Sequence, residues 1–126
     1  MALIKSCLAG GGASLADWLI NKVFSAELTG SNTHVGAVAT FFVPCSGVNS
    51  FTGTLAATIA TNGSFGGTIE YYDSTDTIIG SSTILTEGAN TLNVPSNAVY
   101  AKLTLSNNSH GTAGGGTTTF TFTAIS

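Results

Sequence analysis

The chain has 126 residues, of which 43% are hydrophobic and only 7% are charged, and its formal net charge is −3. This length is enough for one domain that folds without disulfides or metals. The cations are three lysines with no arginine, which excludes a surface that neutralises the phosphates of nucleic acid. Since ordinary soluble domains have about 25% charged residues, we expect a surface of hydroxyls, amides and backbone. Such a surface is compatible with large permanent contacts to other protein subunits.

No apolar stretch approaches the 18 or so residues that a membrane-spanning helix needs, so we expect no membrane insertion. The first residues lack the continuous apolar segment of a secretory signal. We therefore expect a protein that assembles inside a cell. Cys7 and Cys45 match no metal-binding spacing, and we expect two buried free thiols rather than a disulfide.

Residues 14–24 are predicted to form the one helix, with Ser14 as its N-terminal cap. Helical spacing places four large apolar side chains on one face. They are Leu15, Trp18, Leu19 and Val23. We expect this face to bind a partner, either the rest of the chain or a neighbouring subunit, with residues 1–30 as an N-terminal arm and 31–126 as the main domain.

From residue 34 onward the hydrophobic period is two, which predicts β-strands separated by turns. The expected strands cover residues 34–43, 51–59, 68–72, 77–85 with a break at Gly80, 91–94, 99–105 and 117–124. Turns are predicted at Asn62-Gly63 and at Asp73 to Asp76, and a polar loop at 106–116. The spacing of these strands predicts an all-β fold, an antiparallel two-sheet sandwich or jelly roll.

The sequence contains no pattern that indicates catalysis or metal binding. Asp73 and Asp76 flank a predicted turn, so we interpret them as turn formers rather than as a catalytic acid pair or calcium ligands. His34 and His110 are the two histidines, and no nucleophile motif accompanies either. We therefore expect no catalytic residues, no metal and no cofactor, and a protein that is not an enzyme.

Aromatic residues are the remaining candidates for a ligand site. Tyr71 and Tyr72 are adjacent in a predicted strand and must point to opposite faces, and the phase of Tyr100 predicts that it points outward. An exposed tyrosine can stack on a sugar ring, which makes Tyr72 and Tyr100 candidate glycan contacts. Packing of these rings at a subunit contact is an equal alternative.

The stretches at residues 67–73, 78–82 and 94–103 resemble the jelly-roll modules of bacteriophage structural proteins and of carbohydrate-binding modules. The resemblance covers less than half of the chain and consists of strands and turns without a catalytic motif. Lys102 stands near a position where such modules commonly have arginine, so no sugar-binding residue is carried over from them.

The resemblance implies an accessory protein of a bacteriophage virion, such as a capsid decoration, fibre or tail component. We expect a non-enzymatic structural protein that is assembled in the host cytoplasm and binds capsid or tail proteins. It is expected to be a homo-oligomer, with a trimer favoured. The alternative is a glycan-binding module for adsorption to the host surface.

Overall fold

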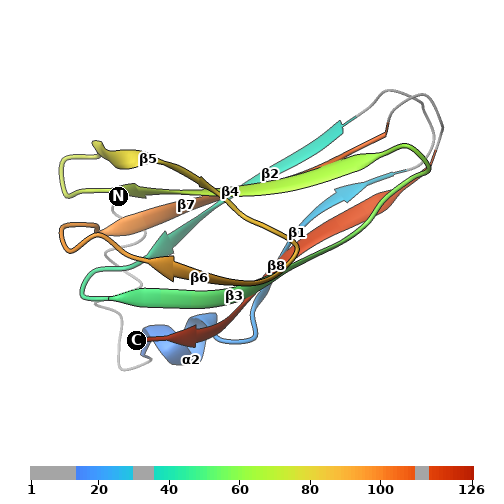
Figure 1. The fold of residues 1–126 in the computed structure, drawn as a ribbon. Coiled ribbons are helices and arrows are strands. Elements are labelled where there is room, and N and C mark those ends of the chain that lie inside the picture. Colours follow the sequence, from blue (N-terminus) through green and yellow to red (C-terminus); the bar gives the residue numbers. More distant parts are fainter. Residues whose placement is uncertain (1–13, 30–35, 110–113) are drawn as a thin grey trace.

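The computed structural model describes residues 14–29, 36–109 and 114–126 (Figure 1). In this part of the chain one short helix and eight strands follow one another. They are α2 (Leu15–Leu19), β1 (Val23–Leu28), β2 (Gly36–Pro44), β3 (Ser50–Thr58), β4 (Ser64–Tyr72), β5 (Ile78–Ile84), β6 (Gly88–Asn93), β7 (Tyr100–Asn108) and β8 (Gly116–Ile125). The predicted all-β fold is confirmed.

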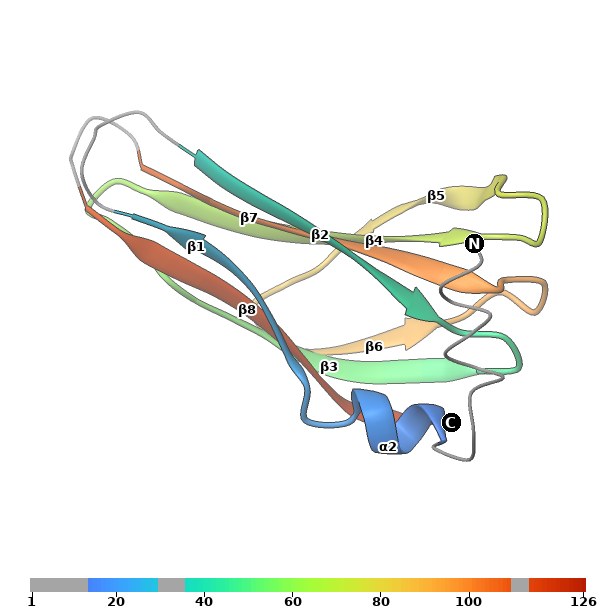
Figure 2. The ribbon, with the colours of Figure 1, turned by 180° about the vertical axis from the view of Figure 1, so that it is seen from behind.

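The strands form two four-stranded antiparallel sheets that pack face to face (Figure 2). We call β1-β8-β3-β6 the threonine sheet and β2-β7-β4-β5 the tyrosine sheet, after the residues on their outer faces. Every connection passes from one sheet to the other, except that β4 and β5 form a hairpin within the tyrosine sheet. Eight strands in this order make a jelly roll.

The core forms because hydrophobic and polar residues alternate along the strands, so each sheet turns one apolar face inward. Phe122 on β8 is fully buried, and its ring centroid lies 5.1 Å from that of Phe51 and 4.9 Å from that of Phe120. The tyrosine sheet contributes the fully buried Leu103 and Leu105 to the same cluster. Complete burial of one such side chain stabilises the fold by about 1.5–3 kcal/mol.

The helix begins as predicted, but its predicted end at Phe24 is wrong. The Ser14 hydroxyl accepts a hydrogen bond from the Asp17 amide at 3.1 Å, which caps the helix. The helix ends at Leu19, and Asn21 has a φ of 67°, in the left-handed region that asparagine tolerates. The Asn21 amide donates to the carbonyl of Phe122 at 2.9 Å, which attaches the chain to β8.

Residues 23–28, which the sequence analysis assigns to the helix end and the N-terminal arm, form β1 at the edge of the threonine sheet. Val23 pairs with Thr121 and Leu28 with Gly116, in continuous antiparallel register. Phe24 and Ala26 point into the core together with Leu28, whereas the residues between them are exposed. Pairing with β8 therefore prevails over the helical spacing of residues 15–23.

Several other boundaries also differ from the predicted ones. β4 begins at Ser64 instead of residue 68, and β6 begins at Gly88 instead of residue 91. β7 continues to Asn108, into the predicted loop, because its last residues still pair with both β2 and β4. β5 is continuous across Gly80, whose φ of 71° coincides with a shift in register between β4 and β5. The predicted turn at Asn62 is confirmed, with a φ of 62° at Asn62 and a hydrogen bond from the Gly63 amide to the Ala60 carbonyl.

Candidate binding surfaces

The described residues contain no group of three or more His, Cys, Asp or Glu side chains that could hold a metal ion. Cys45 is a buried free thiol, and desolvation by burial raises its pKa to about 12. A thiol that remains protonated in the core is not a nucleophile at neutral pH. Cys7, His34 and His110 lie outside the described residues. Within the part of the chain that the structure describes, no helix is long and apolar enough to cross a membrane.

The Asp73 carboxylate is part of the turn between β4 and β5. One of its oxygens accepts hydrogen bonds from the Thr75 amide at 2.9 Å, the Thr75 hydroxyl at 2.7 Å and the Thr77 amide at 3.1 Å. The Thr75 hydroxyl is the largest cause that lowers the Asp73 pKa, followed by the Thr77 and Thr75 amides. This carboxylate thus holds the turn together, in agreement with its interpretation as a turn former.

Three aromatic rings form a row across the outer face of the tyrosine sheet. Phe42 on β2, Tyr100 on β7 and Tyr72 on β4 lie on adjacent strands, and Tyr72 and Tyr100 are direct cross-strand neighbours. The two tyrosine rings are stacked, with centroids 4.9 Å apart and planes 4° from parallel. Phe42 approaches Tyr100 from the other side, with centroids 5.8 Å apart. We call these three residues the aromatic row.

Tyr100 belongs to the outer face as predicted, but it is only 6% exposed because its two neighbours in the row enclose it. Its pKa is raised chiefly by desolvation, and further by the nearby Asp76 carboxylate, to which its hydroxyl is hydrogen-bonded. The accessible rings of the row are therefore Phe42, which is 40% exposed, and the partly exposed Tyr72. Tyr71 points into the core, on the face opposite to Tyr72.

Polar side chains continue the same face beyond the aromatic row. The Lys102 ammonium lies 3.5 Å from the Glu70 carboxylate, and both side chains are partly buried. Ser82 on β5 donates a hydrogen bond to the second oxygen of Glu70 at 3.0 Å. The outer face of the tyrosine sheet therefore combines an apolar end with a small polar network.

The four predicted partner-binding residues do not form one surface. Leu19 is fully buried in the core of the chain itself, and Leu15 packs partly against the same core. Trp18 and Val23 remain on the surface, 37% and 59% exposed. The ammonium of Lys22 lies 5.5 Å from the centroid of the Trp18 ring, so that a cation covers part of the ring.

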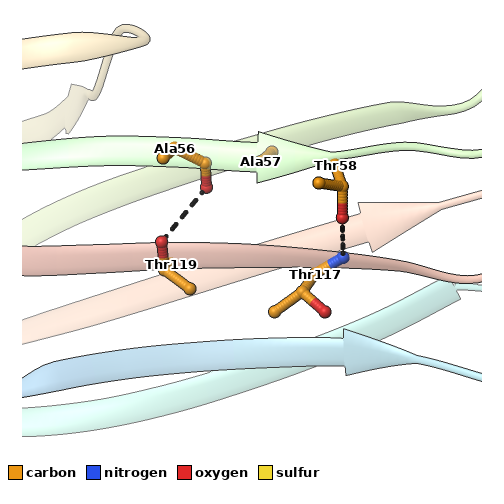
Figure 3. Close-up of a pocket in the computed structure, with 5 residues that line it drawn as sticks. All are labelled: Ala56, Ala57, Thr58, Thr117 and Thr119. Carbon is orange, nitrogen blue, oxygen red and sulfur yellow. Dashed lines mark hydrogen bonds between the residues drawn. The ribbon is translucent and has the colours of Figure 1, made fainter.

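The outer face of the threonine sheet holds a shallow depression of about 200 Å³ between β3 and β8 (Figure 3). Its lining residues are Ala56, Ala57, Thr58, Thr117 and Thr119. The Thr119 hydroxyl donates to the Ala56 carbonyl, and the Thr58 hydroxyl accepts from the Thr117 amide, so the hydroxyls bond to neighbouring strands. The sequence signal for this depression is the short side chain of Ala56 within an alternation of threonines.

Large apolar side chains are exposed at several places on the described surface. They are Trp18, Val23, Val38, Phe42, Ile59, Ile78 and Ile84. Five of these residues, Phe42 of the aromatic row among them, lie on strands β1, β2 or β5 at sheet edges rather than in a single pocket. From the sequence, only Trp18 and Val23 of this set were predicted as contact residues. The others were missed, because the alternation along a strand does not show that the strand lies at the edge of a sheet.

No family model matches the chain, and no curated protein matches its sequence. Among solved structures it is similar to a chain of the glycosylation-associated protein complex Gap123 from Streptococcus agalactiae, with a TM-score of 0.49 and 10% identity over 79% of this chain and 44% of that one. It is also similar to the enzymatically active domain of tailspike protein 4 from bacteriophage CBA120, with a TM-score of 0.48 and 14% identity over 80% of this chain and 19% of that one. The chain thus spans less than half the length of either neighbour, and we base no function on these distant likenesses.

Proposed function

We propose that this protein is a non-enzymatic structural component of a bacteriophage virion, a decoration, fibre or tail accessory subunit that acts through protein–protein contacts. The observation that supports this most is the combination of seven large exposed apolar side chains among the described residues with a chain that is only 7% charged. Exposed apolar side chains on a surface with so few charges are compatible with permanent protein–protein contacts. The likeness of the sequence to phage jelly-roll modules gives the proposal its phage context.

Trp18 and Val23 are the contacts that we assign to the capsid or tail partner. Trp18 lies in α2, and Val23 is the first residue of β1. α2 packs at one end of the sandwich, beside the C-terminal end of β8 (Figure 1). An exposed tryptophan supplies a large contact area with few rotatable bonds, which is why tryptophan is enriched among the residues that dominate binding. Binding at many equivalent positions on a particle would add to the modest energy of one such contact.

The test is the protein content of virions purified by density gradient from a host that carries the gene. We expect mass spectrometry to find the chain at a fixed ratio to the major capsid protein. Trp18→Ala should lower that ratio, whereas Ser25→Ala, an exposed change on β1, should leave it unchanged. Absence of the chain from intact virions would contradict the proposed function.

Glycan binding is the second candidate, and the exposed rings of the aromatic row favour it. A sugar ring would contact Phe42 and Tyr72, while the enclosed Tyr100 would support them from its place between the two rings. A glycan array tests this directly: Phe42→Ala and Tyr72→Ala should each abolish binding, and no signal with the unaltered protein would exclude the candidate. Thr123→Ala, on the outer face of the other sheet, is the matched control.

A further inference from the structure

Strand β2 forms one edge of the tyrosine sheet. One side of it pairs with β7 in nine consecutive residue pairs, from Gly36 opposite Asn108 to Pro44 opposite Tyr100. Within the described residues no strand pairs with its other side. An edge of this kind presents a row of N–H and C=O groups that can pair with a further strand.

The other three sheet edges carry features that hinder pairing along the strand, whereas the one such feature of β2, Pro44 without an N–H, lies at its last residue. β5 has a shifted register beside Gly80, β1 contains the charged Glu27, and β6 is only six residues long. β2 is nine residues long, is regular throughout and contains no charged residue. Its outer side chains include Val38, which is 69% exposed, and Phe42. Natural proteins protect edges by charges, bulges or short length, so the absence of all three at β2 indicates an edge that is paired in the working assembly.

The sequence of β2 is complementary to itself about its central residue, Thr40. In an antiparallel pair centred there, each large side chain meets a smaller or β-branched one from the other copy. The opposing residues are Val38 with Phe42, Ala39 with Phe41, and Ala37 with Val43. Aromatic and β-branched residues are favourable cross-strand neighbours, and this pattern specifies a second β2 as the partner strand.

We propose that two copies of this chain pair through their β2 strands, antiparallel and centred on Thr40, to join their tyrosine sheets into one continuous eight-stranded sheet. This inference rests on the proposed structural function and specifies its oligomeric unit. A strand paired antiparallel with its own copy has twofold symmetry, so the unit is a dimer instead of the trimer favoured from the sequence. The dimer places Val38 of each copy beside Phe42 of the other and leaves Trp18 on the surface for a different partner.

Cysteine cross-linking tests the register. In Thr40→Cys the two new thiols face each other across the twofold axis, where opposite Cα atoms are about 4.5–5.5 Å apart, within the range that a disulfide spans. In Val38→Cys, on the same face of the same strand, each cysteine faces Phe42 of the other copy, and the two cysteines are about 13 Å apart along the strands. Both variants are made with Cys7→Ser. We expect a covalent dimer from Thr40→Cys under mild oxidation and essentially none from Val38→Cys.

Light scattering of the unaltered chain should give twice its 12.6 kDa mass. Thr40→Lys should give a folded monomer, because two like charges then face each other at the axis. Ile84→Lys, which also changes an exposed position on an edge strand, β5, should remain a dimer. Equal cross-linking of the two cysteine variants, or a monomeric unaltered chain, would overturn the inference. If the chain is a monomer but is present in virions, the dimer is contradicted and the proposed function is not. If the chain is a dimer but is absent from virions, only the proposed function is contradicted.

Discussion

Replacement of Phe122 by alanine is the substitution that tests the packing of the sandwich most severely. Phe122 is fully buried, and its ring contacts Phe24, Phe51 and Phe120 at centroid distances of 5.8, 5.1 and 4.9 Å. Because close-packed rings surround the site, it cannot collapse around the alanine, and a cavity remains. Phe→Ala changes at such sites cost about 3–5 kcal/mol. A domain has only about 5–15 kcal/mol in total, so the variant should lose a large part of its free energy of unfolding.

The assay is urea unfolding followed by circular dichroism, with the unaltered chain measured in parallel. Thr121→Val is the control, since Thr121 precedes Phe122 in β8 but belongs to the outer face and should change the free energy of unfolding by less than about 0.5 kcal/mol. A loss below about 1 kcal/mol for Phe122→Ala would refute the packing described here. Equal losses in both variants would show that β8 as a whole, rather than its inner face, responds to substitution.

Three further predictions concern single groups in the structure. The buried Asn107 amide donates hydrogen bonds to the Thr118 hydroxyl and to the Thr58 carbonyl, both at 3.0 Å. Because both acceptors lose their partner in Asn107→Ala, this variant should lower the free energy of unfolding by about 1–3 kcal/mol in the same urea assay. Hydrogen bonds lower the folded-state pKa of Asp73 below its ordinary value of 3.8, so the stability that it contributes is present above that pH and is lost as the pH falls through the folded-state pKa. The acid part of the pH dependence of stability should therefore shrink in Asp73→Ala, and an unchanged acid profile would contradict the turn geometry. Burial raises the pKa of Cys45 to about 12, so in the folded Cys7→Ser protein this thiol should not react with a thiol reagent at pH 8, whereas in urea it should react. Rapid labelling of the folded protein would show that the core is open.

The sequence predicts most of the strands because their signals are local. The alternation of Thr117, Thr119 and Thr121 with Phe120 and Phe122 is enough to assign β8 and its inner face. The turns at Asn62 and Asp73 are likewise local, since the side chain or backbone of one residue sets each of them. Local patterns thus account for the all-β fold and for the number of strands beyond residue 34.

Features that depend on pairing between distant segments could not be predicted. Residues 15–24 fit a helical spacing, and only the bond from Asn21 to Phe122 and the pairing of β1 with β8 show where the helix ends. The asparagine was a local signal for that end, because it tolerates positive φ. Tyr100 was correctly assigned to the outer face, but its enclosure depends on Tyr72 and Phe42, which reach it through the registers of β4 and β2 with β7.

We propose that the protein works by binding copies of itself and a larger particle, rather than by chemistry at a pocket. The most direct test of this proposal is the mass of the purified chain by light scattering, alone and then mixed with virions from which the chain is missing. We expect a species heavier than one 12.6 kDa chain, and we expect it to bind to the particles. A monomer at every concentration that leaves the particles unoccupied would contradict it.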